Sequence, residues 1–237
     1  LSRQIRRVQG AEYLGKLNGA TGTFGAHVVA VPEADWPALS RAFVESLGLV
    51  WNPLTTQIEP HDWQADLYAD VAHANRIAHN LATDMWTYIS LDYFHQRLAA
   101  QGSTGSSTMP HKVNPIRFEN AEANLEISSA LLETLAATLV TSRMQRDLTD
   151  STTQRNVGAA LGHSLLAFDT LVRGLAGVEP MVVLVDVQEL GGLDLRQPDR
   201  RDVAGVAPKR LVHRLVDALR LERPVLEGRL ALHRGLA

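Results

Sequence analysis

The strongest constraint on the fold is an apolar repeat that runs from Asp62 to about Leu98. Most gaps between its apolar side chains are three or four residues, the spacing that places them on one face of a helix. At 1.5 Å per residue, one helix over this range would be on the order of 50 Å long. It would need other long helices to cover its stripe. The members of the repeat are Leu67, Val71, Ala74, Ile77, Leu81, Met85, Ile89 and Leu98.

Two further helices are expected after this one, the first beginning near Ile116 and the second near Thr152. Their apolar residues are Leu125, Leu131, Leu132, Leu135 and Leu139 in the first, and Leu161, Leu165, Phe168 and Val172 in the second. The three patterns together predict an all-α fold, an elongated helical bundle over residues 62–177.

The amino-terminal residues 1–58 predict two short helices joined by loops. The first covers the opening LSRQIRRVQGAEYL, and the second follows the acidic Glu33–Asp35 and ends at Gly48. Between them, GKLNGATGTFGAH contains too few branched residues to make a good strand. The opening reads as a helix already under way, without a signal peptide, so we expect a piece of a longer protein.

Composition excludes several classes of function. The net charge of −3 gives no basic surface for nucleic acid, and no apolar run approaches the roughly 20 residues that span a membrane. The chain has no cysteine, which favours a reducing, cytoplasmic location. No pair of histidines has the helical spacing of a metal site, so we expect no metal.

The loop between the first two long helices has the residues of an anion-binding segment. Residues 105–115 read GSSTMPHKVNP, in which Lys112 supplies a positive charge and Asn114 a neutral donor between two prolines. Such donors suit a carboxylate and the negative charge that develops on it during a reaction. On composition alone, the loop is equally a polar connection between helices.

The same loop resembles the signature of the fumarase/aspartase superfamily, and His111 after Met-Pro favours its adenylosuccinate lyase branch. Three other segments resemble bacterial adenylosuccinate lyases of the enteric type: GKLNGATGTFGAH, WNPLTTQIEPHDW and RMQRDLTDSTTQRN. The resemblance runs from residue 1 to about Val178. It implies the central helical domain of that superfamily, incomplete at its amino terminus, over residues 1–178.

The resemblance also implies roles for individual residues. Ser106 would be the general base that removes a proton beside a succinyl carboxylate, and no cofactor would be needed. The implied substrates are adenylosuccinate and SAICAR, each releasing fumarate, in a homotetrameric enzyme. The residues that would bind substrate are Gln57, Ser107, Lys112, Val113, Asn114 and Asn120, with Arg146, Ser151 and Arg155 at the nucleotide end.

Each of these roles has a simpler alternative. Gln57 and Asn120 are equally ordinary surface residues, and the two arginines are equally partners of Asp147, Asp150 or Glu119. Five histidines are candidates for the general acid, and none is assigned this role. His61 is the least improbable of them because it follows a binding motif. The five are His27, His61, His79, His95 and His163.

The family's general acid is a histidine in a Thr-His-x-Gln-Pro-like segment that these 237 residues do not contain. General acid–base catalysis contributes roughly 10²–10⁴-fold, so we expect little activity from this chain alone. Two alternatives stay open: another superfamily lyase, such as argininosuccinate lyase or a cycloisomerase, and a non-catalytic helical assembly protein.

Residues 179–237 differ from the rest in composition. From Pro180 onward there is no Ile, Phe, Tyr, Trp, Ser, Thr or Asn. Glu189–Leu193 can be encoded so that the frame one base later reads Asn-Trp-Glu-Val-Leu, a segment the family has at about this place. We therefore expect a frameshifted tail, with a divergent domain carrying a helix over 208–221 as the alternative.

Overall fold

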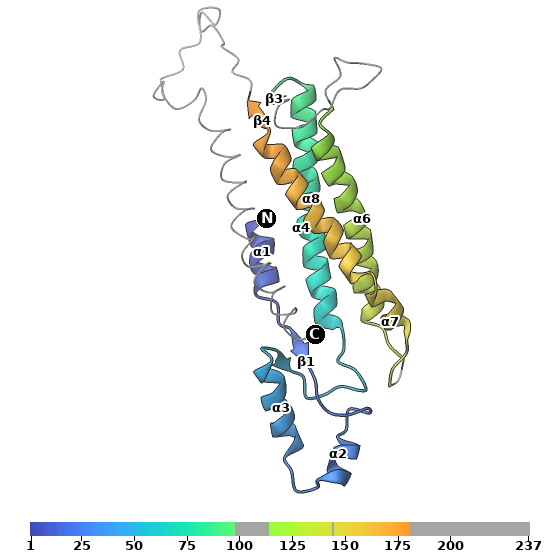
Figure 1. Cartoon of the computed structure of the whole chain (residues 1–237). Coiled ribbons are helices and arrows are strands. Elements are labelled where there is room, and N and C mark those ends of the chain that lie inside the picture. Colours follow the sequence, from blue (N-terminus) through green and yellow to red (C-terminus); the bar gives the residue numbers. More distant parts are fainter. Residues whose placement is uncertain (98–113, 144, 181–237) are drawn as a thin grey trace, which may run out of the picture. The chain divides into compact units, whose positions relative to one another are not determined.

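The computed structural model describes residues 1–97, 114–143 and 145–180, and Figure 1 shows the order of their helices and strands. Of the predicted tail, residues 179–237, only Glu179 and Pro180 lie in this part of the chain, so the fold of the tail stays a prediction. The helices are α1 (Ser2–Gln9), α2 (Gly25–Ala30), α3 (Trp36–Ser46), α4 (Asp62–Ser90), α6 (Ile116–Leu139), α7 (Thr149–Gln154) and α8 (Val157–Ala176). The strands are β1 (Leu14–Gly15), β2 (Val50–Trp51), β3 (Phe94–Gln96) and β4 (Val178–Pro180).

The mainly helical fold predicted from the apolar spacing is confirmed. The described residues form two compact units: the first has residues 1–78 and 124–165, and the second has residues 79–123 and those from 166 onward. Each unit contains parts of α4, α6 and α8. The predicted boundary between residues 178 and 179 is a separate matter and stays a prediction.

The amino-terminal helices follow their sequence signals. In α3, the side chain of Asp35 accepts a hydrogen bond from the backbone N–H of Ala38 at 3.1 Å, which satisfies one free donor of the first turn. Beyond its end, Gly48 adopts φ +77°, a left-handed conformation typical of the residue after a helix. The glycine-rich segment differs from the expectation twice: Gly15 pairs with Trp51 in a two-residue strand, and the end of the segment begins α2, a helix that was not predicted.

The first long helix is shorter than predicted. It ends at Ser90, because Asp92 takes a left-handed φ of 58° and the chain then enters β3, which pairs with β4 in the second unit. The sequence is consistent with this earlier end, since the last gap in the apolar repeat, from Ile89 to Leu98, is nine residues long. The third helix is also divided, into α7 and α8, by a turn at Arg155–Asn156.

The core of the first unit is formed by one face each of α4, α6 and α8. Its buried side chains are Tyr68, Ala72, Leu132, Leu135, Leu139 and Ala160. A polar layer continues this core: Asn75 donates to the Ser128 hydroxyl at 2.9 Å, Ser128 donates to the Ala160 carbonyl at 2.8 Å, and Ser164 donates to Asn75 at 2.7 Å. Because every bond joins two different helices, the layer fixes their alignment.

In α4 and α8 the buried column is displaced by about one residue from the predicted stripe. The column in α4 is Tyr68, Ala72, Asn75, Ala78, Ala82 and Met85, of which only Met85 was predicted. In α8, Ala160 and Ala167 are fully buried, whereas the predicted Leu165 is 56% exposed. Alanine columns allow helix backbones to approach closely and leave the larger side chains at the edges of the contact.

Candidate functional site

The Gly-rich segment and the Thr-Thr-Gln loop fit together with almost no space between them. Gly22 has φ +76°, and a Cβ atom at this position would lie 1.9 Å from the carbonyl oxygen of Thr55. Only glycine fits such an approach. Nearby, the side-chain amide of Asn18 donates to the Thr55 hydroxyl at 2.7 Å. These two segments are therefore locked to each other.

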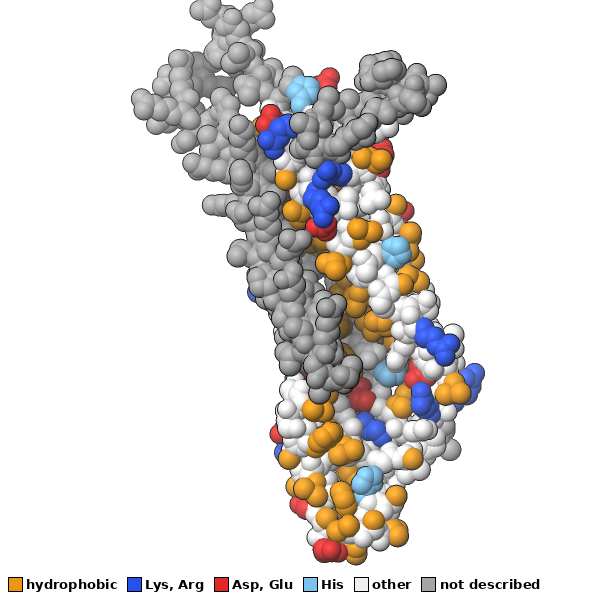
Figure 2. All heavy atoms as spheres, in the orientation of Figure 1, with side chains coloured by type: hydrophobic (Ala, Val, Ile, Leu, Met, Phe, Trp, Pro, Cys, Tyr) orange, Lys and Arg blue, Asp and Glu red, His pale blue; other side chains and the backbone are white. Residues whose placement is uncertain are grey.

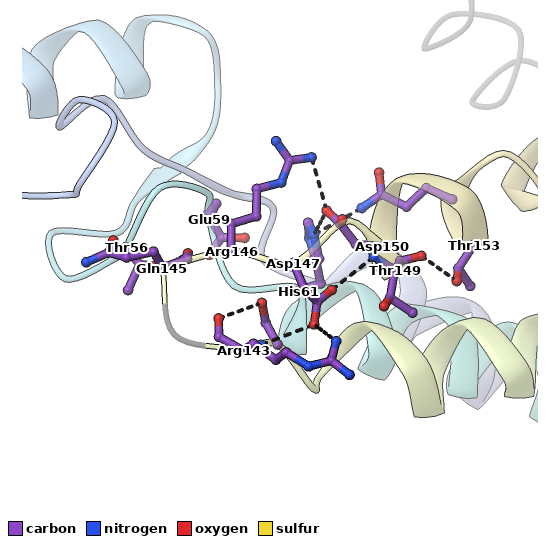
Figure 3. Close-up of polar contacts among 12 residues, drawn as sticks. Thr56, Glu59, His61, Arg143, Gln145, Arg146, Asp147, Thr149, Asp150 and Thr153 are labelled. Carbon is purple, nitrogen blue, oxygen red and sulfur yellow. Dashed lines mark hydrogen bonds and ion pairs between the residues drawn. The ribbon is translucent and has the colours of Figure 1, made fainter.

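The Thr-Thr-Gln loop is also bonded to the segment that carries Arg146. The Thr56 hydroxyl donates to the carbonyl of Gln145 at 2.8 Å, and the Thr56 carbonyl accepts from the Lys16 ammonium group at 3.3 Å. Burial lowers the pKa of Lys16 from its ordinary value. We call these three segments, residues 16–22, 55–61 and 145–154, the loop junction; Figure 3 shows the contact between the last two.

Gln145 holds an unusual backbone conformation at this junction. Its φ of 66° lies in the left-handed region, which costs a residue with a Cβ roughly 1–2 kcal/mol. The hydrogen bond from the Thr56 hydroxyl to the Gln145 carbonyl stabilises this conformation. The conformation of Gln145 in turn sets the position of the next residue, Arg146.

Arg146 is partly buried and only partly paired. Its Nη2 atom lies 3.6 Å from Oδ2 of Asp150, and 29% of its side chain is exposed. The buried Nε of Arg146 and the buried Oδ1 of Asp150 have no hydrogen-bond partner. A guanidinium that is anchored on one side and has an unpaired N–H on the other suits the binding of an anionic group.

His61 and Gln154 complete the surroundings of Asp150. The Nε2 atom of His61 lies 3.5 Å from Asp150 Oδ2 and 3.0 Å from the Gln154 side-chain amide. Figure 3 shows His61 and Asp150 on one side of the Arg146 segment. The carboxylate considered as a simple ion-pair partner of Arg146 is thus part of a larger cluster.

The turn before α7 is built by a second carboxylate, Asp147. It accepts hydrogen bonds from the backbone N–H groups of Thr149 at 3.0 Å and Arg143 at 3.2 Å, and pairs with the Arg143 guanidinium. The bond from Thr149, followed by that from Arg143, lowers the pKa of Asp147. Asp147 is therefore a structural anion that shapes this turn.

Glu59 is a half-buried carboxylate that the sequence did not single out. Its two oxygens accept from the Asn52 amide at 3.1 Å and the Trp63 indole at 2.7 Å. Burial raises its pKa despite these bonds. With both oxygens engaged by the protein, Glu59 supports the loop rather than facing a ligand.

The residues expected to bind substrate fall in both units. Gln57 is exposed and adjoins Thr56, Ser151 is half-buried in α7, and Arg155 is exposed at the end of α7. In the second unit, Asn114 is half-buried just before α6 and Asn120 is exposed on α6. The expected base Ser106 lies outside the described residues, as do Ser107, Lys112 and Val113.

Several junction residues were missed, although all lie inside the three motifs quoted from the sequence. Lys16, Asn18 and Thr55 carry no catalytic signal of their own, because their hydrogen bonds depend on segments 37–40 residues away. Within the described parts of the chain, no group of three potential metal ligands occurs. No helix there is long and apolar enough to cross a membrane.

Comparison with known proteins identifies the class. Residues 1–128 match the lyase family, and residues 142–188 match the family described as adenylosuccinate lyase C-terminal. The chain therefore belongs to the lyase family. The second match runs past Val178, where the resemblance was expected to end.

The similar proteins are adenylosuccinate lyases. The chain is 51% identical over 179 residues to that of Escherichia coli K12 and 50% identical over 179 residues to that of Haemophilus influenzae, in each case 76% of this chain. It is 52% identical over 159 residues to the Legionella pneumophila protein, or 67% of this chain. The chain spans 39% of the length of the first two relatives and 35% of the third.

Proposed function

We propose that this chain carries part of the active site of an adenylosuccinate lyase, which splits adenylosuccinate into AMP and fumarate and SAICAR into AICAR and fumarate in purine biosynthesis. The family membership supports the reaction class. The shared name of the relatives supports the substrate. The cytoplasmic location expected from the cysteine-free composition is kept as part of the proposal.

The strongest support for the proposal is one contact, the hydrogen bond from the Thr56 hydroxyl to the Gln145 carbonyl at 2.8 Å. Gln57 follows the donor residue and Arg146 follows the acceptor residue. A single bond thus fixes the loops that carry a proposed substrate-binding amide and a proposed nucleotide-binding cation.

The chemistry assigned to the chain is its part of an elimination. A proton leaves carbon, the C–N bond then breaks as the C=C bond of fumarate forms, and the leaving nitrogen takes a proton from the family's general acid, which these 237 residues do not contain. Ser106 removes the proton, and Lys112 and Asn114 bind the carboxylates on which negative charge develops. Ser107, Val113 and Asn120 complete the succinyl side. Arg146, Ser151 and Arg155 bind the nucleotide, with the phosphate on Arg146. No cofactor takes part.

A homotetramer is part of the same proposal. Leu161 and Leu165 on α8 are 41% and 56% exposed, and Figure 2 shows hydrophobic side chains at the surface of the face it draws. Leucines on one helix face gain stability when further helices cover them. The homotetramer is that of the complete enzyme, whose sedimentation tests this point; a strictly monomeric enzyme at high concentration would contradict it.

The nucleotide assignment is tested by calorimetric titration of the purified chain with AMP and with adenosine. We expect AMP to bind more tightly, and Arg146→Met to lower its affinity roughly 10–100-fold, the loss typical of a charge-assisted bond. Adenosine affinity should not change. Equal loss for both ligands, or no binding of AMP, would contradict the assignment.

A further inference from the structure

Asp150 is shared between a cation and an imidazole. Its Oδ2 atom lies 3.6 Å from Arg146 Nη2 and 3.5 Å from His61 Nε2. The side chains of Asp150 and His61 are each 13% exposed. At this burial, a carboxylate with only one loose partner would be costly, so the second contact has a physical purpose.

The contacts of His61 define which ring nitrogen carries the proton. A lone pair on Nε2 would repel the Asp150 carboxylate, whereas an Nε2–H group donates to it. The structure places the amide nitrogen of Gln154 3.0 Å from the same Nε2 atom. An N–H group there would compete with the Nε2–H group, whereas the amide turned by 180° presents its oxygen instead. With the amide so turned, the Nε2–H group of His61 faces two acceptors, both on α7.

The arrangement leaves Arg146 anchored but available. Because His61 contacts the same Oδ2 atom, the Asp150 carboxylate is held in one orientation, and the guanidinium that pairs with it is held in one direction. The buried Nε of Arg146 keeps its hydrogen unpaired in this cluster.

We propose that His61 is a positioning residue for Arg146: by fixing the Asp150 carboxylate, it holds the guanidinium in the orientation that binds the phosphate of a nucleotide. The inference rests on the proposed function for the nature of the ligand. The positioning itself rests on the Arg146–Asp150–His61 contacts.

The variants follow from the chemistry of the ring nitrogen. His61→Asn cannot reach Asp150 with a donor, whereas the longer His61→Gln places an amide N–H near the position of Nε2. His73→Asn is the matched control, since His73 is exposed on α4 in the same unit. Thermal unfolding of all three verifies that each variant is folded.

The first measurement needs no ligand: the 15N relaxation of the Arg146 Nε–H group. We expect the ordered signal of the original chain to become mobile in His61→Asn, and to stay ordered in His61→Gln and His73→Asn. An equally ordered Arg146 signal in folded His61→Asn would overturn the proposal.

The second measurement is a double-mutant cycle on AMP affinity with Arg146→Met. His61→Asn should weaken AMP binding roughly fivefold in the original chain and not at all in the Arg146→Met background. Equal losses in both backgrounds would show that His61 acts independently of Arg146 and would overturn the proposal. If the original chain binds no AMP, the proposed function fails, and the relaxation measurement still decides the positioning.

Discussion

The helical core and the loop junction of the first unit are stabilised in different ways. The core is a set of apolar side chains on α4, α6 and α8, joined by one polar layer. The junction is a set of hydrogen bonds between segments 37–93 residues apart, with left-handed backbone at Gly22 and Gln145. The structure of the core depends on the size and spacing of its side chains, whereas the structure of the junction depends on individual hydrogen bonds and close contacts. Substitutions in the core should therefore affect stability, and substitutions in the junction should affect both stability and ligand binding.

The largest expected effect is on the core. Leu132 is fully buried among α4, α6 and α8, so Leu132→Ala should lower the free energy of unfolding by about 2–5 kcal/mol, from lost burial and the cavity left behind. Chemical denaturation measures this loss. A loss below about 1 kcal/mol would remove the distinction, and Leu39→Ala, at a position on α3 that is 52% exposed, provides the control.

Gly22→Ala tests the closeness of the junction. The new Cβ would overlap the Thr55 carbonyl, and the residue would keep a left-handed φ, so we expect a loss of about 2–3 kcal/mol. Gly48→Ala is the matched control: its φ is +77°, yet nothing lies within 4 Å of the added Cβ.

The control should lose only the strain, about 1 kcal/mol. Denaturation of the two variants under one condition compares them directly. Equal losses would mean that backbone strain alone, and not the contact with the Thr-Thr-Gln loop, requires glycine at position 22.

The polar layer should have a smaller effect than the apolar core. Ser128→Ala removes the donor to the Ala160 carbonyl and the acceptor for Asn75, leaving both without that partner in a buried position. A loss of about 1–3 kcal/mol is expected. The exposed Ser46→Ala, which removes a bond to the Phe43 carbonyl, should cost far less. Similar losses in both variants would contradict a special role for the layer.

Glu59 should give the smallest effect, visible as a dependence on pH. Burial raises its pKa in the folded chain, so the folded state holds the proton more tightly than the unfolded state does. Its contribution therefore favours folding near the ordinary pKa and falls as pH rises through the raised value.

Glu59→Gln should remove this dependence of stability on pH. Melting temperatures between about pH 4.5 and 7 measure it, with Glu45→Gln, on the exposed face of α3, as the control. If the melting temperature of Glu59→Gln depends on pH as that of the original chain does, this carboxylate has the same pKa in the folded and unfolded states.

The sequence predicted the helices well and their buried faces less well. Four of the five predicted leucines of α6 are buried, and Leu131 is partly buried. The buried column of α4 and the first half of that of α8 consist largely of small side chains, and a search for large apolar residues finds the neighbouring column. The helices themselves are still predicted correctly, because the spacing of three or four residues is the same on every face of a helix.

The candidate site was predictable only as a set of segments. Resemblance indicated Gln57, Arg146, Ser151 and Arg155, but no local pattern shows that the Thr56 hydroxyl reaches the Gln145 carbonyl. Such contacts depend on tertiary placement. The role of Arg146 was left open between ligand binding and ion pairing, and the structure places Asp150 in contact with both Arg146 and His61.

We propose that segments 55–61 and 145–154 of the loop junction bind the nucleotide together. Backbone amide shifts of the purified chain, recorded during titration with adenylosuccinate, test it most directly. We expect shifts to gather at Thr56, Gln57, Gln145, Arg146 and Ser151, and Arg146→Met to require a roughly 10–100-fold higher ligand concentration for the same shifts. Shifts confined to other parts of the chain, or unaffected by Arg146→Met, would contradict it.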